Sequence, residues 1–194
     1  HVIDDMMGRI EYIIDGGPCQ VGVESTVLDV TSDVPVILRP GGVTLEMLEK
    51  VLGNVCADSV LEIKGDLKPR SPGMKYRHYS PKAEMFLVSG KPDSVVKKIN
   101  ELIKESSRKG LKVGVLTSRE NEDKYNADVI ITAGSVMHIE QIAAGLYDSL
   151  RTFDDEKVDI IYSETFEEKG VGRAVMNRLK KASAGKIIKA DEEN

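Results

Sequence analysis

Met85-Phe-Leu-Val-Ser89 and Val113-Gly-Val-Leu-Thr117 are two short apolar runs that do not alternate with polar residues. Such runs are typical of strands in parallel sheets, because helices cover both faces of these sheets. The segment between the two runs is predicted to be a helix that ends at Gly110. Its apolar residues lie at helical spacing and form one face: Val95, Val96, Ile99, Leu102 and Ile103. A strand, a helix and a strand in this order predict a parallel β-α-β unit.

The same alternation continues towards the end of the chain. Asp128–Thr132 and Asp159–Ser163 predict two further strands, and helices are predicted over Ile139–Leu150 and over about 171–182. We therefore predict an α/β fold in which residues 83–194 form a Rossmann-like three-layer domain, with a parallel sheet between helices. No Gly-x-Gly-x-x-Gly follows its first strand and the chain has no P-loop pattern, so an ordinary dinucleotide or P-loop site is not expected.

A glycine-rich turn, Gly170-Val-Gly-Arg173, opens the last predicted helix. Backbone amides at the start of a helix can bind an anion. Glycines at such a place also serve a tight turn into the helix with no ligand involved. The sequence leaves both readings open.

Residues 1–66 differ from this pattern because they are rich in glycine and β-branched residues. Strand-like runs occur at Ile10–Asp15, Glu24–Val30 and Val34–Leu38, and three residues separate the last two. These two runs predict an antiparallel hairpin. A helix is predicted next, with Thr44 as its N-cap and Gly53 at its end.

The hairpin is expected to bring polar side chains together. Counting back from its turn places Ser25 or Thr26 opposite Arg39, with Cβ atoms roughly 5 Å apart. Glycine pairs at 16–17 and 41–42 flank this end and would let a ligand approach the backbone. The pattern fits a binding site, and it equally fits a hairpin end with an exposed arginine.

Residues 71–81 read Ser-Pro-Gly-Met-Lys-Tyr-Arg-His-Tyr-Ser-Pro. Two prolines and a glycine exclude a regular helix or a central strand. The stretch carries cations or potential cations at Lys75, Arg77 and His78, interleaved with Tyr76 and Tyr79. Cations suit the phosphates of a nucleotide and aromatic rings suit its base. The alternative is a linker that happens to be basic and aromatic.

Composition excludes several classes of protein. The net charge is -5, so broad electrostatic attraction to nucleic acid or to an anionic membrane is not expected. No apolar run approaches the roughly 20 residues that span a bilayer. Cys19 and Cys56 lack metal-ligand spacing and fit a reduced, cytoplasmic protein, in which Cys19 is expected to be buried. The three histidines are scattered, so no metal site is predicted, and no catalytic nucleophile or triad can be assembled. We therefore assign no catalytic residue and expect binding chemistry.

Several motifs resemble one known family. Asp15-Gly-Gly-Pro-Cys19, Gly22-Val-Glu-Ser-Thr-Val-Leu-Asp29 and Ile37-Leu-Arg-Pro-Gly-Gly42 are similar to the second half of a YrdC-like domain. Residues 71–81 resemble the linker of the two-domain threonylcarbamoyl-AMP synthases, and Gly170-Val-Gly-Arg-Ala-Val-Met-Asn-Arg-Leu179 is similar to the closing helix of their Rossmann-like domain. The resemblance implies a partial YrdC-like α/β domain over 1–66, a linker over 67–82 and the Rossmann-like domain over 83–194.

The resemblance implies an enzyme that uses L-threonine, bicarbonate and ATP to make threonylcarbamoyl-AMP and release pyrophosphate. Its product feeds the machinery that makes threonylcarbamoyladenosine in tRNA, in the cytoplasm, and Mg²⁺ is expected to accompany ATP. By resemblance, Ser25 contacts threonine, whereas Arg39 and Tyr79 contact the nucleotide. Secondary candidates lie beside these residues: Thr26, Lys75, Tyr76, Arg77 and His78.

The chain also departs from the family pattern. It begins at His1 without a Met, and the Lys-x-Arg and Ser-x-Asn elements that precede these motifs in the family are absent. We expect a C-terminal fragment that is inactive alone, with residues 1–66 poorly packed or rearranged and the C-terminal domain able to fold unaided. The alternatives are a binding module that contacts RNA through the linker, and a regulatory or oligomerisation role for the C-terminal domain. Direct RNA binding is left open.

Overall fold

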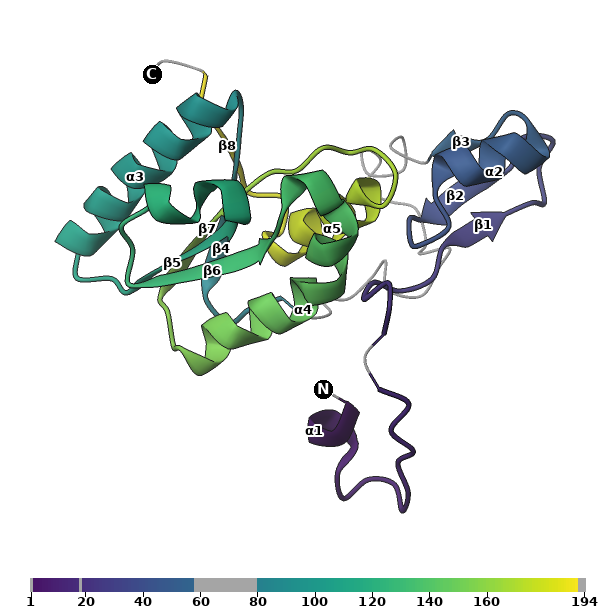
Figure 1. The fold of residues 1–194 in the computed structure, drawn as a ribbon, viewed down its shortest axis with the longest axis horizontal. Helices are drawn as coiled ribbons and strands as arrows, with labels where there is room; N and C mark the ends of the chain where they lie inside the picture. Colours follow the sequence, from purple (N-terminus) through teal and green to yellow (C-terminus); the bar gives the residue numbers. More distant parts are fainter. Residues whose placement is uncertain (1, 18, 58–79, 192–194) are drawn as a thin grey trace.

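Two sheets organise the chain, as Figure 1 shows. The computed structural model describes residues 2–17, 19–57 and 80–191. A three-stranded sheet of order β1-β2-β3 lies in the part we call the hairpin region, residues 19–57. A five-stranded sheet of order β6-β5-β7-β4-β8 lies in the part we call the five-stranded domain, residues 80–191.

All strand pairs of the five-stranded domain are parallel. Its strands run in chain order as β4 (Glu84–Ser89), β5 (Val113–Ser118), β6 (Val129–Gly134), β7 (Ile160–Glu164) and β8 (Ile187–Lys189). The four predicted strands correspond to the first four of these, and the predicted α/β fold is confirmed. The short edge strand β8 was not predicted, because three residues with a single neighbouring strand leave no pattern to detect.

Helices cover both faces of this sheet (Figure 1). They are α3 (Pro92–Arg108), α4 (Ile139–Asp155) and α5 (Gly172–Ala182). The connection from β4 to β5 runs across the sheet in the direction opposite to those from β6 to β7 and from β7 to β8. Right-handed crossovers therefore place α3 on one face and the pair α4 and α5 on the other. Within the residues that the structure describes, no helix has the length and apolar character that crossing a bilayer requires.

Each face of the sheet has its own hydrophobic core. Successive side chains of β5 point to opposite faces, so that Val115 packs with α3 whereas Leu116 packs with α4 and α5. Phe153 of α4 is fully buried and lies against Gly114, where an added Cβ would be 2.7 Å from its ring. Such close packing gives this domain most of the buried apolar surface of the described chain.

A buried carboxylate holds the carboxyl ends of β5 and β7 together. Glu164 is 5% exposed and ends β7. Its oxygens accept hydrogen bonds from the Thr117 hydroxyl at 3.0 Å, the Ser118 amide at 3.0 Å and the Asn121 amide group at 2.8 Å. The Tyr125 hydroxyl donates a further bond at 2.6 Å. These donors satisfy a charge that would be costly to bury alone. Asn121 belongs to the short 3₁₀ helix η1 (Arg119–Lys124), and a second one, η2 (Val136–His138), precedes α4.

The first part of the chain contains short elements. They are α1 (Val2–Met6), β1 (Val27–Asp29), β2 (Val36–Arg39), α2 (Leu45–Leu52) and β3 (Cys56–Ala57). The predicted hairpin is confirmed as the antiparallel pair β1 and β2, although both strands are shorter than expected. Helix α2 has the predicted ends, since the Thr44 hydroxyl accepts a bond from the Met47 amide at 3.3 Å and Gly53 follows its last turn. Strand β3, two residues long, was not predicted.

Two expectations for this part were wrong. Ile10–Asp15 forms no strand: Ile10 makes an isolated bridge to Met7, whereas Tyr12 and Ile14 are 89% and 96% exposed. A strand requires a neighbouring strand for its backbone hydrogen bonds, and none pairs with this run among the described residues. Cys19 is exposed instead of buried.

The expected poor packing is confirmed for the described residues of the first 66. Within 2–17 and 19–57, Ile37 and Val55 are the only buried apolar side chains.

Candidate functional site

Arg39 and Ser25 meet at the end of the hairpin. The Nε atom of Arg39 donates to the Ser25 carbonyl oxygen at 3.0 Å, and Nη2 donates to the Ser25 hydroxyl at 3.2 Å. The predicted proximity is therefore confirmed. The predicted register was wrong, because Arg39 pairs with Val27 and an irregularity follows between Val27 and Leu28. The guanidinium thus reaches past the end of β1 to a serine that lies outside the strand.

Thr26 has a different role from its neighbour. Its hydroxyl donates to the Val43 carbonyl oxygen at 2.6 Å and ties β1 to the loop that precedes α2. Gly41 lies in the same loop, where an added Cβ would be 2.4 Å from both the Glu24 carbonyl oxygen and the Thr26 amide nitrogen. The space that this glycine opens is therefore filled by the chain's own backbone and not by a ligand. Ser25 is exposed, so its hydroxyl is the accessible one of the pair.

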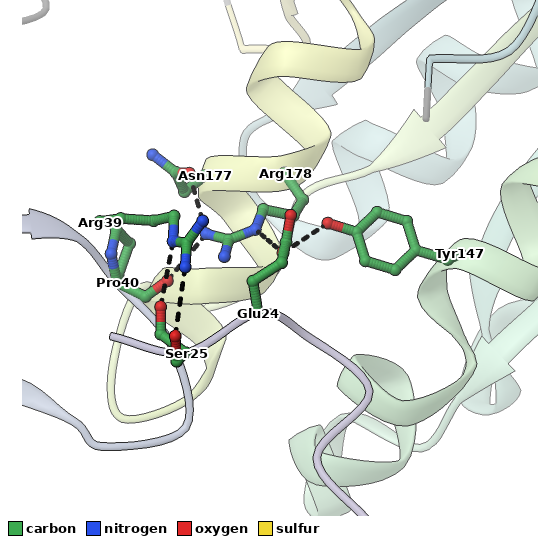
Figure 2. A network of polar contacts seen from close by, with 7 residues as sticks. All are labelled: Glu24, Ser25, Arg39, Pro40, Tyr147, Asn177 and Arg178. Atoms are coloured by element: carbon green, nitrogen blue, oxygen red, sulfur yellow. Dashed lines mark hydrogen bonds and ion pairs between the residues drawn. The ribbon is translucent and has the colours of Figure 1, made fainter. Parts of the chain in front are cut away.

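A second arginine approaches the same place from the five-stranded domain (Figure 2). Arg178 of α5 donates from Nε to the Glu24 carboxylate at 2.8 Å and from Nη1 to the Pro40 carbonyl oxygen at 2.8 Å. Nη1 also bonds to Oδ1 of Asn177 at 3.0 Å. The Tyr147 hydroxyl, from α4, donates to the same Glu24 oxygen at 2.7 Å. We call Glu24, Pro40, Tyr147 and Arg178 the interdomain network.

Electrostatics fix the protonation of this network. Burial raises the pKa of Glu24, but the hydrogen bond from Tyr147, the backbone and the charge of Arg178 outweigh it, so the pKa lies below its ordinary value. Burial and the hydrogen bond to Glu24 raise the pKa of Tyr147 far above its ordinary value. Glu24 is therefore a carboxylate and Tyr147 a neutral donor at neutral pH.

Sequence reasoning did not find these residues, although a signal was present. Arg178 lies three and four positions after Val175 and Ala174, and therefore on the apolar face of α5. Tyr147 lies on the apolar face of α4 in the same way. A charged residue on a face that helix periodicity predicts to be buried needs a partner. The pattern predicts that a partner exists and does not say which residue it is.

The glycine-rich turn before α5 is already in contact with an anion of the same chain. The Gly170 amide donates to the Glu46 carboxylate of α2 at 3.3 Å. Hydrogen bonds from its own backbone amide and from Thr44 hold the pKa of Glu46 below its ordinary value, and the charge of Arg173 contributes. This contact is a second polar link between the hairpin region and α5.

The remaining predicted site residues belong to the linker. Lys75, Tyr76, Arg77, His78 and Tyr79 lie outside the described residues. The part of the chain that the structure describes contains no group of three or more His, Cys, Asp or Glu residues that could hold a metal ion.

A cavity of about 520 Å³ lies between α1 and the C-terminal end of α4. Five of its eleven lining residues are aspartates, among them Asp5, which pairs with Arg151 at 2.7 Å. Among the described site residues, Ser25, Thr26 and Arg39 are not part of its lining.

Comparison with known proteins identifies the family of this chain. Residues 43–184 match the family model described as threonylcarbamoyl-AMP synthase, C-terminal domain. The chain belongs to the threonylcarbamoyl-AMP synthase family. Residues 1–41 of this threonylcarbamoyl-AMP synthase family member match a second model, described as telomere recombination. The resemblance seen in the sequence motifs is thereby confirmed.

Relatives in the threonylcarbamoyl-AMP synthase family are similar over nearly the whole chain. The threonylcarbamoyl-AMP synthases of Bacillus subtilis (strain 168) and Pyrococcus abyssi are each 48% identical over 189 residues, which is 97% of this chain. These residues correspond to 53% and 54% of the two relatives. The chain therefore spans about half the length of the curated relatives it matches.

Solved structures of the threonylcarbamoyl-AMP synthase family share this fold. A crystal structure of P. abyssi Sua5 complexed with L-threonine has a TM-score of 0.88 at 48% identity, over 97% of this chain and 54% of that one. A His-to-Ala, Tyr-to-Ala double variant of P. abyssi Sua5 has a TM-score of 0.89 at 46% identity, over 100% of this chain and 54% of that one. The hairpin region is thus not rearranged relative to these relatives.

Proposed function

We propose that the protein containing this chain makes threonylcarbamoyl-AMP from L-threonine, bicarbonate and ATP, with release of pyrophosphate. The proposal rests on the Ser25–Arg39 pair at the exposed end of the hairpin. This pair lies in a chain that belongs to the threonylcarbamoyl-AMP synthase family. An accessible hydroxyl and a guanidinium held 3.2 Å apart offer neighbouring contacts to a small polar substrate and to an anion.

We assign these residues to the two substrates. The Ser25 hydroxyl binds threonine, and the Arg39 guanidinium binds the nucleotide, whose phosphates are anionic. Tyr79 adds a contact to the nucleotide, and the secondary candidates in the linker precede it in the sequence: Lys75, Tyr76, Arg77 and His78. Thr26, the remaining candidate, acts by holding the backbone beside Ser25, because its hydroxyl is bonded to Val43.

The chemistry needs no side-chain nucleophile. Threonine and bicarbonate condense to a carbamate with loss of water, and a carbamate oxygen then forms a bond to the α-phosphorus of ATP. The bond from that phosphorus to the bridging oxygen breaks, and pyrophosphate leaves. Residues that place the carbamate beside the phosphate and neutralise developing charge are sufficient for such a transfer. Ser25 and Arg39 fit this role because they are already bonded to each other.

Mg²⁺ completes the proposal. This ion commonly binds through substrate phosphates together with a few protein oxygens, without a dedicated protein cage. The absence of a metal-binding cluster from the described residues fits an ion that arrives with ATP. The product would pass to the tRNA-modifying machinery in the cytoplasm.

The test is pyrophosphate release from ATP by the intact gene product, with threonine and bicarbonate each present or omitted. We expect release to require both, and we expect the 194-residue chain alone to be inactive. Ser25→Ala should raise the KM for threonine, whereas Ser32→Ala, in the hairpin turn, should not, because its hydroxyl bonds only locally to Val34. Release that ignores either co-substrate would contradict the proposal, and salt-dependent RNA binding would then be the property to measure.

A further inference from the structure

Arg178 is a charged side chain in a buried position. The residue is 5% exposed, and its neighbours on α5 include the core residues Val175 and Leu179. A guanidinium in such a place is costly unless nearby groups neutralise it and accept its hydrogen bonds. The identity of those groups therefore shows what the side chain does.

Apart from the adjacent Asn177, the groups that accept hydrogen bonds from Arg178 lie in the hairpin region. Nε bonds to the Glu24 carboxylate and Nη1 to the Pro40 carbonyl oxygen, both at 2.8 Å. Glu24 directly precedes Ser25, and Pro40 directly follows Arg39. One guanidinium from the five-stranded domain thus holds a residue next to each member of the proposed substrate-binding pair, through the Glu24 side chain and the Pro40 backbone, as Figure 2 shows.

Contacts from α4 hold the same segment. Tyr147 donates to the Glu24 oxygen that Arg178 also binds. Two residues earlier, Gly22 lies so close to α4 that an added Cβ would be 2.3 Å from the Ala144 Cα. The segment that leads to Ser25 is therefore held by a carboxylate with two donors and by a backbone contact that excludes a side chain.

We propose that Arg178 is a positioning residue, through which the five-stranded domain sets the placement of Ser25 relative to Arg39. It acts through Glu24 and Pro40, which are the chain neighbours of Ser25 and Arg39. The effect on the reaction rests on the proposed function, whereas the effect on the hairpin does not. Because small misplacements of reacting groups are costly, loss of this brace should lower kcat/KM by about 10- to 100-fold.

The test compares two charge-removing variants on the same helix in the intact gene product. Arg178→Met removes the brace. Lys180→Met removes a positive charge two residues away, where it forms a partly exposed pair with Glu168, a residue of the five-stranded domain itself. We expect Arg178→Met to lower kcat/KM for threonine with the KM rising, and Lys180→Met to change little. Arg178→Lys should be intermediate, because an ammonium can pair with Glu24 but lacks the planar fork that also reaches Pro40.

Hydrogen–deuterium exchange supplies a readout that does not depend on activity. Backbone amides of residues 22–30 and 36–43 should exchange several-fold faster in Arg178→Met than in the wild type or in Lys180→Met, whereas β4, β5 and β7 should be unchanged. Glu24→Gln should reproduce the effect and serves as the second variant if Arg178→Met does not fold. Equal exchange of the hairpin in all variants would overturn the positioning role. A wild-type protein without threonine-dependent release would instead overturn the proposed function, and the exchange result would still decide the role of Arg178.

Discussion

The five-stranded domain and the hairpin region are stabilised by different kinds of interaction. The domain has two cores of fully buried apolar side chains, one on each face of its sheet. The described residues before position 58 bury only Ile37 and Val55 among their apolar side chains, and their Ser25–Arg39 end is fixed by hydrogen bonds to α4 and α5. The comparison teaches that the stable core and the proposed binding pair can reside in separate parts of one chain, with a few polar contacts joining them.

The largest effect should come from the core of the five-stranded domain. Phe153→Ala removes a fully buried ring that packs against Gly114, and it should reduce the free energy of unfolding of this domain by about 3–5 kcal/mol. Denaturant unfolding followed by circular dichroism measures it. Ile37→Ala in the hairpin should shift the same transition clearly less, and an equal shift would show that the two regions unfold as one unit.

A smaller loss is expected at the buried carboxylate between β5 and β7. Glu164→Gln removes the charge and faces its donors with an amide group that is itself a donor. The free energy of unfolding should fall by about 1.5–3 kcal/mol. Glu168→Gln is the matched control, since its exposed pair with Lys180 contributes at most about 1 kcal/mol. If both variants lose the same free energy of unfolding, the hydrogen bonds to Glu164 do not stabilise the domain.

Two glycines of the hairpin region test how it contacts α4. Gly22 and Gly53 both have positive φ, +71° and +76°, but an added Cβ meets the α4 backbone at Gly22 and open space at Gly53. Each alanine variant should incur a backbone strain of about 1 kcal/mol. Gly22→Ala alone should also displace the hairpin, with faster amide exchange in residues 22–30. The same exchange in Gly53→Ala would mean that strain, and not contact, is responsible.

The smallest effect should appear in alkaline titration of the tyrosines. Burial, followed by the hydrogen bond to a glutamate, raises the pKa of Tyr125 and of Tyr147 above the ordinary value. A raised pKa stabilises the fold fully below the ordinary value near 10, and this contribution is lost as pH rises through the raised value. Glu24→Gln should therefore let Tyr147 ionise at a lower pH than in the wild type. Tyr125 should ionise as in the wild type, because its partner Glu164 is unchanged. Tyrosinate absorbance measures this, and an unchanged titration would contradict the coupling of Tyr147 to Glu24.

Local patterns in the sequence predicted much of the fold. Uninterrupted apolar runs indicated β4, β5, β6 and β7, and Thr44 and Gly53 marked the two ends of α2. These features depend on residues close together in the chain, where periodicity and capping chemistry operate. Strand β8 and the failure of Ile10–Asp15 to form a strand depend instead on which strand is available as a neighbour.

Only part of the candidate site was predicted, because only part of it depends on residues close together in the chain. A turn of three residues brings Ser25 near Arg39, so local reasoning sufficed for their proximity, although not for the register. The partner of Arg178 lies in a distant segment, and its choice depends on how two regions pack. Helix periodicity marks Arg178 as buried, but only the tertiary arrangement identifies Glu24.

The long separation of that pair has a consequence for the timing of folding. Glu24 and Arg178 are 154 positions apart, and β4, α3, β5, β6, α4 and β7 are all made between them. A ribosome therefore releases the hairpin long before it releases α5, and closing so long a loop is slow compared with forming local contacts. The nascent hairpin gains its brace only once α5 has emerged, so the geometry of the proposed Ser25–Arg39 site is assembled late.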